Sequence, residues 1–195
     1  SFDLSAVNIE ENSGRSPINY VLPPGVDRTQ DPANPQLRLL NEQSIVLRVN
    51  ELKVGDARAA YKSMDMDIRQ YKRLKMYVHA EAKDDGGVAD KDLVAFIRIG
   101  SDFTNNYYEY EVPLKVSPFY QNSPSSVWPT ENEFNINLES LQQVKLERND
   151  LRRSGSLVDY NKPFRREDPE NVNNTIVIMG SPSLSNVQNI MIGVR

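Results

Sequence analysis

The sequence contains no cysteine, one histidine and one tryptophan in 195 residues. The absence of cysteine excludes disulfide bonds, thiolate nucleophiles and cysteine-based zinc sites. Apolar runs are also short, and none approaches the roughly 20 residues that a membrane-spanning helix needs. We therefore expect a soluble chain that does not itself span a membrane.

A surplus of basic charge is missing as well. The chain carries 27 acidic and 23 basic residues, for a net charge of -4, and the basic residues are scattered. This distribution does not favour the counterion release that drives binding to a phosphate backbone, so nucleic acid is not expected as a partner. The one basic cluster, at residues 152–153 and 165–166, is mixed with acidic residues. Residues 147–173 are accordingly predicted to form a long polar loop.

The sequence does contain a series of short segments in which apolar and polar side chains alternate. A period of two residues is typical of half-buried β-strands, and residues 57–61 are also expected to be extended. The run at 93–99 is apolar on both faces, which predicts a central strand. In the run at 107–114, one face is expected to bury tyrosines while Glu109 and Glu111 on the other point to water. The predicted strands are residues 2–9, 41–49, 74–80, 93–99, 107–114, 134–138, 175–179 and 188–195.

These strands, with turn residues between them and a helical turn expected only at 138–144, predict an all-β fold. We predict an antiparallel β-sandwich, with a galactose-binding-like jelly roll preferred over an immunoglobulin-like arrangement. Prolines at positions 17, 23, 24, 32 and 35 favour an extended, polyproline-like N-terminal arm. We therefore divide the chain into a Pro-rich arm, residues 1–40, which packs on the sandwich or on a neighbouring segment, and a sandwich domain, residues 41–195.

Candidate catalytic and metal-binding residues are few. His79 lies on a predicted strand without a nucleophile beside it, so a structural role is preferred. Glu109 and Glu111 have the separation of a glycosidase pair, but solubilising charges on a strand are the preferred interpretation. Four aspartates around a Gly-Gly turn could offer oxygens to calcium, yet the EF-hand spacing is missing and a solvated turn is preferred. These aspartates are Asp84, Asp85, Asp90 and Asp92. We predict no catalytic residue, no metal, no cofactor and no enzymatic activity.

Aromatic residues concentrate between positions 107 and 128. Tyr107 and Trp128 are the candidates for stacking on a sugar if their rings are exposed. Burial is the preferred interpretation, because most strand aromatics belong to a core. A carbohydrate-binding module of a cell-surface protein is therefore kept as the alternative function.

Seven stretches of the sequence carry a family resemblance. They are residues 18–25, 31–44, 55–62, 69–74, 96–102, 105–114 and 190–195. Together they resemble the SprA family of Bacteroidota, called Sov in some members. The opening Ser1-Phe2-Asp3-Leu4, without Met or a signal sequence, is expected for a segment cut from a longer chain.

The resemblance implies an outer-membrane translocon of the type 9 secretion system, which exports folded proteins and is linked to gliding motility. It implies that this chain is a soluble structural and interaction domain of that translocon. The expected partners are other segments of the same large chain and secretion-system proteins. The expected location is the cell envelope, associated with the outer membrane on its periplasmic or extracellular face. The resemblance supplies no catalytic residues.

Overall fold

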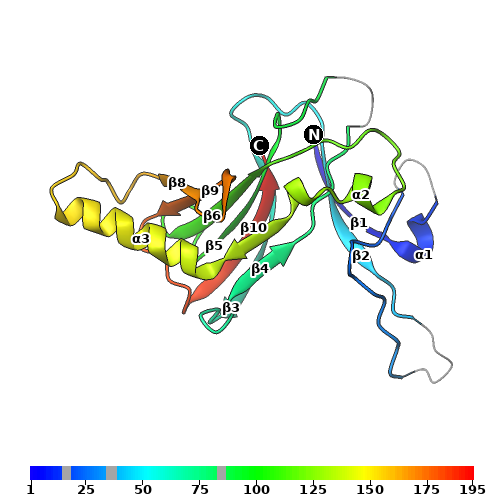
Figure 1. Cartoon of the computed structure of the whole chain (residues 1–195), viewed down its shortest axis with the longest axis horizontal. Coiled ribbons are helices and arrows are strands. Elements are labelled where there is room, and N and C mark those ends of the chain that lie inside the picture. Colours follow the sequence, from blue (N-terminus) through cyan, green and yellow to red (C-terminus); the bar gives the residue numbers. More distant parts are fainter. Residues whose placement is uncertain (15–18, 34–38, 83–86) are drawn as a thin grey trace. The chain divides into compact units, whose positions relative to one another are not determined.

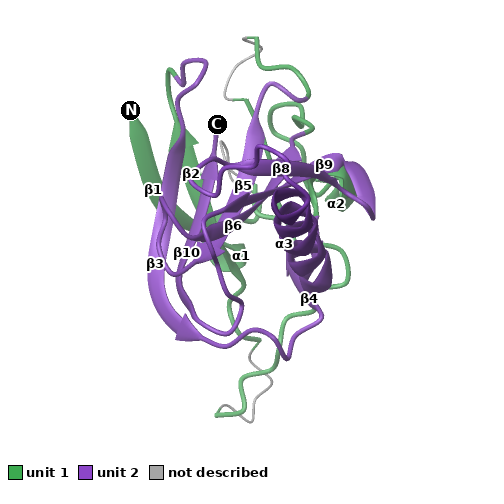
Figure 2. Ribbon diagram, turned by 90° about the vertical axis from the view of Figure 1, so that its left-hand side faces the viewer, with its two compact units in different colours: residues 1–51, 77–90, 115–133 green, residues 52–76, 91–114, 134–195 purple. Residues whose placement is uncertain are grey.

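The computed structural model describes residues 1–14, 19–33, 39–82 and 87–195. The chain divides into two compact units, coloured separately in Figure 2. Unit 1 comprises residues 1–51, 77–90 and 115–133, and unit 2 comprises residues 52–76, 91–114 and 134–195.

Unit 1 is built on a two-stranded antiparallel sheet. Strand β1 (Phe2–Asn8) pairs with β2 (Gln43–Val49), from Phe2 opposite Val49 to Asn8 opposite Gln43. The short helix α1 (Ile9–Asn12) begins where β1 ends, and the Asn8 side chain caps it by accepting a hydrogen bond from the Glu11 amide. The unit also contains helix α2 (Pro124–Val127) and the 3-10 helix η1 (Thr130–Asn132). The predicted strands at 2–9 and 41–49 are confirmed.

Unit 2 is built on a six-stranded antiparallel sheet with the order β3-β10-β5-β6-β9-β8 (Figure 1). Its strands are β3 (Arg58–Met66), β5 (Val94–Gly100), β6 (Tyr107–Pro113), β8 (Phe164–Asp168), β9 (Asn171–Met179) and β10 (Val187–Val194). Strand β5 lies inside the sheet and buries residues on both faces, as its apolar sequence predicts. The extended structure expected at 57–61 is confirmed by β3.

One face of this sheet carries the apolar side chains of the core. Tyr108 and Tyr110 of β6 lie opposite Ile178 and Ile176 of β9, and all four are buried. The Tyr110 hydroxyl donates a hydrogen bond to Asp168, which satisfies both polar groups inside the core. The prediction that one face of the 107–114 strand buries tyrosines is confirmed.

A helix accompanies this sheet. Strands β4 (Arg73–Met76) and β7 (Phe134–Asn137) pair with each other, and β7 leads directly into helix α3 (Leu138–Arg153). Asn137 caps the helix by accepting a hydrogen bond from the Glu139 amide at 3.0 Å. Helix α3 packs against β7, β8 and β9, and its buried residues include Leu138, Leu141 and Val144 at helical spacing.

The predicted long loop at 147–173 is therefore wrong. Helix α3 continues to Arg153, β8 begins at Phe164 and β9 begins at Asn171. The charged Arg148 interrupts the apolar spacing between Val144 and Leu151, so the pattern that marks the first half of the helix is lost in its second half. In β8, charged side chains occupy strand positions because at least one of them, Arg165, pairs with a carboxylate of the sheet.

The described residues are mostly antiparallel strands with few helices, which confirms the all-β prediction. A jelly roll and a Pro-rich arm are not confirmed, and the division at residue 40 stays a prediction. Pro17 and Pro35 lie outside the described residues. Within the part of the chain that the structure describes, no helix has the length and apolar character needed to cross a membrane.

Candidate functional site

The candidate site is the charged face of the six-stranded sheet. Because side chains alternate along a strand, Tyr107, Glu109 and Glu111 of β6 lie on the face opposite the buried tyrosines. Glu109 is only 2% exposed and Glu111 only 6% exposed. The prediction that these carboxylates point to water is wrong, because arginines from other parts of the same sheet cover them.

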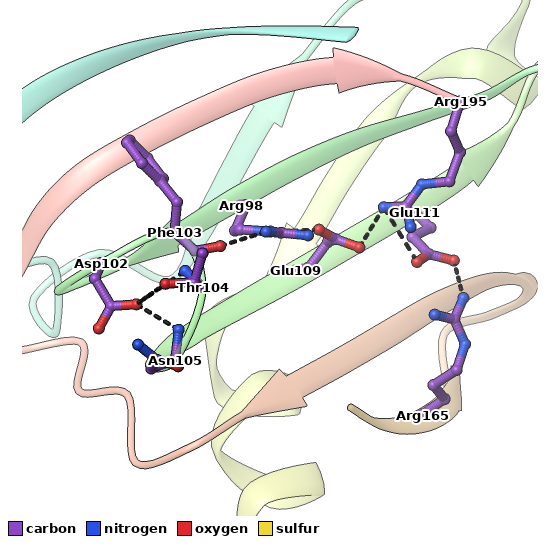
Figure 3. Close-up of polar contacts among 9 residues, drawn as sticks. All are labelled: Arg98, Asp102, Phe103, Thr104, Asn105, Glu109, Glu111, Arg165 and Arg195. Atoms are coloured by element: carbon purple, nitrogen blue, oxygen red, sulfur yellow. Dashed lines mark hydrogen bonds and ion pairs between the residues drawn. The ribbon is translucent and has the colours of Figure 1, made fainter. Parts of the chain in front are cut away.

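Three arginines hold the two glutamates in a network that runs across the sheet (Figure 3). Arg98 of β5 donates from Nε to Glu109 Oε2 at 2.6 Å. Arg195, directly after β10, donates to Glu109 Oε1 and lies 3.5 Å from Glu111 Oε1. Arg165 of β8 donates to Glu111 Oε2. Three positive charges facing two negative ones leave the network with one positive charge in excess.

The arginines also pack on aromatic rings. The Arg98 guanidinium lies 3.9 Å from the centroid of the Tyr107 ring, and that of Arg195 lies 4.5 Å from the centroid of Phe96. Gly193 leaves room for this stacking, because a Cβ there would come within 2.5 Å of the Phe96 ring. The aromatic rings thus fix the planes of the cations that bind the glutamates.

The loop between β5 and β6 adds a further partner for Arg98. The Phe103 carbonyl accepts a hydrogen bond from the Arg98 guanidinium. Asp102 shapes this loop by accepting from the backbone amides of Thr104, at 2.9 Å, and Asn106, at 3.1 Å. Partial burial opposes ionisation of Asp102, but hydrogen bonds from the Asn105 amide, the Asn106 side chain and the two amides above prevail and lower its pKa to about 2.

The environment of Glu111 raises the pKa of its carboxyl group. Burial is the main cause and a hydrogen bond with Glu109 adds to it, while Arg165 and Arg195 act in the opposite direction. Each glutamate is engaged by two arginines. The arrangement holds charges from β5, β6, β8 and the residue after β10 in fixed positions across the sheet, which suits a stiff polar surface.

The two residues predicted to stack on a sugar belong to different units. Tyr107, in unit 2, is buried and carries the Arg98 guanidinium on its ring. Trp128, in unit 1, is 9% exposed, and its indole Nε1 donates to the Val21 carbonyl at 2.9 Å. Its ring also makes an edge contact with Tyr77, at 6.1 Å between centroids. Each ring therefore has protein neighbours of its own, and sugar binding by Tyr107 and Trp128 stays an untested prediction.

His79 lies in unit 1 beside the same tryptophan. The His79 and Trp128 ring centroids are 6.1 Å apart, and His79 Nε2 lies 3.9 Å from Glu81 Oε2. Burial lowers the pKa of His79, which favours the neutral imidazole and weakens any ion pair with Glu81. This packing agrees with the structural role predicted for His79.

The predicted acidic turn is described only in part. Asp84 and Asp85 lie outside the described residues, and Asp90 accepts a hydrogen bond from a backbone amide at 2.8 Å. Among residues 1–14, 19–33, 39–82 and 87–195, no group of three or more histidines and acidic residues is placed to hold a metal ion.

Comparison with known proteins places the chain in a family. The model of the SprA_N family, described as a motility related/secretion protein, matches residues 1–195. The chain belongs to this family. SprA_N membership confirms the resemblance seen in the sequence, and it gives the chain a motility- or secretion-related role associated with the cell envelope. No curated protein matches the chain.

Proposed function

We propose that the chain is a structural and interaction domain of the outer-membrane translocon of the type 9 secretion system, supporting protein export and gliding motility. The observation that carries this proposal is the match to the SprA_N family over residues 1–195. The proposed partners are other segments of the same large chain and secretion-system proteins. The proposed location is the periplasmic or extracellular side of the outer membrane.

The charged face supports a role without catalysis. A general acid or base must be free to exchange a proton with a substrate. Glu109 and Glu111 are instead nearly inaccessible and held by arginines. We propose that they stiffen the sheet and take no part in a reaction.

The same face also offers exposed groups that a neighbouring segment could contact. Met191 of β10 pairs with Tyr61 of β3 on one side and with Arg98 of β5 on the other. Because side chains of paired residues point to the same face of a sheet, Tyr61 lies on the charged face with Arg98. Tyr61 is 69% exposed and the Arg165 side chain is 50% exposed. Tyrosine and arginine, together with tryptophan, are the residue types enriched among the anchors of protein interfaces.

We also propose that residues 1–40 act as an arm whose described part packs on neighbouring residues of unit 1. The Val21 carbonyl accepts from Trp128, and the Pro24 carbonyl accepts from the Tyr77 hydroxyl at 2.9 Å. Both contacts join the Pro-rich segment to residues more than fifty positions away in sequence.

The test is an in-frame deletion of residues 1–195 from the full-length protein in its native cells. We expect the shortened protein to reach the cell envelope but to lose export of secreted proteins and spreading on agar. The matched control is Val54→Ala, because Val54 lies in a fully exposed turn and its replacement should leave export unchanged. Normal export by cells that carry only the deleted form would contradict the proposal.

A further inference from the structure

Arg148 of α3 is a buried cation without an acidic partner. Its side chain is fully buried, at 0% exposure, and its Nε and Nη1 atoms have no hydrogen-bond partner among the described residues. A single hydrogen bond joins Nη2 to Asn149 Oδ1, at the long distance of 3.5 Å. Burying a charge is costly unless it is paired, so this guanidinium has unused capacity for an anion.

Two more cations lie on the same side of α3. Lys145 and Arg152 stand three residues before and four residues after Arg148, which places all three side chains in one row. The Arg152 guanidinium lies 4.3 Å from the centroid of the Tyr160 ring, and that of Arg148 lies 4.2 Å from it. Lys145 donates from Nζ to the Pro182 carbonyl at 2.7 Å.

The acidic residues of α3 do not neutralise this row. Asp150 pairs with Arg153, and Glu147 pairs with Arg166 at 2.7 Å. Within the described residues, no ion pair joins Lys145, Arg148 or Arg152 to a carboxylate. The row therefore concentrates positive charge on a chain whose net charge is -4.

Tyr160 is the ring that lies over the two guanidinium groups. It belongs to the segment that follows α3 and leads back to β8, seen beside the helix in Figure 1. The Gly180 amide donates to the Tyr160 carbonyl at 2.9 Å, which fixes the backbone at this point. Leu157 of the same segment is fully exposed. A peptide could reach Arg148 only if the half-buried Tyr160 side chain moved off the two guanidinium groups.

We propose that Lys145, Arg148 and Arg152 bind the carboxylates of an acidic peptide segment in a partner protein. Guanidinium groups recognise carboxylates through two parallel hydrogen bonds, and Arg148 has the unused donors that this requires. The row spans seven residues of helix, or about 10 Å. Acidic side chains two apart on an extended peptide are about 7 Å apart, so two of them can reach this row together. A single small anion cannot contact Lys145 and Arg152 together across this span. The inference is independent of the role proposed for the charged sheet face.

The experiment is calorimetric titration of the purified chain with a hexaglutamate peptide. Hexaglutamine serves as the neutral control, and inorganic phosphate serves as the small-anion control. We expect saturable binding of hexaglutamate, no binding of hexaglutamine, and at least tenfold weaker binding of phosphate. Absence of hexaglutamate binding by the folded chain would overturn the proposal, and equal affinity for phosphate would show an adventitious anion only.

Single-residue variants test whether hexaglutamate binds at the row of Lys145, Arg148 and Arg152. Arg148→Met should abolish hexaglutamate binding, and Arg152→Gln should weaken it at least fivefold. Arg153→Gln is the matched control, because Arg153 is exposed and paired with Asp150, and it should bind as the unmodified chain does. The urea midpoint of Arg148→Met should equal or exceed that of the unmodified chain, because an apolar side chain of similar length removes an unpaired buried charge. Unchanged binding in either Arg148→Met or Arg152→Gln would overturn the assignment.

Discussion

Replacement of Arg98 by methionine tests whether the charged face is a buried network. The change removes the 2.6 Å ion pair with Glu109 and the hydrogen bond to the Phe103 carbonyl. Glu109 is 2% exposed and would keep Arg195 as its only cation. Loss of one partner from a buried ion pair costs about 3–5 kcal/mol. We expect the lower end, about 3 kcal/mol, because Arg195 remains and methionine still packs on Tyr107.

Urea unfolding followed by far-UV circular dichroism measures this loss in the purified chain. A decrease of about 3 kcal/mol in the free energy of unfolding corresponds to a Tm lower by about 6–12 °C for a chain of this size. The control is Arg153→Gln, whose exposed pair with Asp150 should contribute at most about 1 kcal/mol. If Arg98→Met changed stability no more than this control, the network would not be buried in the way described.

Three further predictions concern the packing around the sheet and the tryptophan. Gly193→Ala should destabilise the chain by about 1–3 kcal/mol in the same urea assay, because the added Cβ would collide with the Phe96 ring. Tyr110→Phe should cost about 2 kcal/mol, because it removes a buried hydrogen bond to the Asp168 carboxyl group, and an unchanged urea midpoint would contradict that bond. Trp128 fluorescence should show a short-wavelength maximum and no saturable quenching by oligosaccharides, because the ring is buried and hydrogen-bonded; quenching that saturates would favour the carbohydrate-binding alternative.

The positions of the strands could be predicted from the sequence because alternation of side chains is a local property. Residues 93–99, for example, are predicted to form a central strand because both of their faces are apolar. In the structure the corresponding strand, β5, lies between β10 and β6 inside the sheet. The partners of Glu109 and Glu111 could not be predicted in this way. Arg98 is 11 residues from Glu109, but Arg195 is 86 residues from it and Arg165 is 54 residues from Glu111. These contacts depend on the order of the strands in the sheet. The alternation of side chains along a single strand does not determine that order.

The second half of α3 was missed for a related reason. Leu138, Leu141 and Val144 follow a helical spacing, but the charged Arg148 interrupts it before Leu151, so the second half resembles a solvated loop. In the structure Arg148 occupies the buried position instead, with its guanidinium on the Tyr160 ring. A charged residue in a core position, paired with an aromatic ring twelve positions later, leaves no periodic signal in the sequence.

The titration of Glu111, followed by carbon-13 NMR of its side-chain carboxyl group, tests the central claim most directly. Burial and the hydrogen bond with Glu109 raise the pKa of Glu111 above 4.5 in the folded chain. The folded chain then holds the proton more tightly than the unfolded chain, so the associated stability is fully present below the ordinary glutamate pKa. That stability is lost as the pH rises through the folded value. We predict a titration midpoint above that of an exposed glutamate; a midpoint equal to that of an exposed glutamate would contradict a buried network on this face of the sheet.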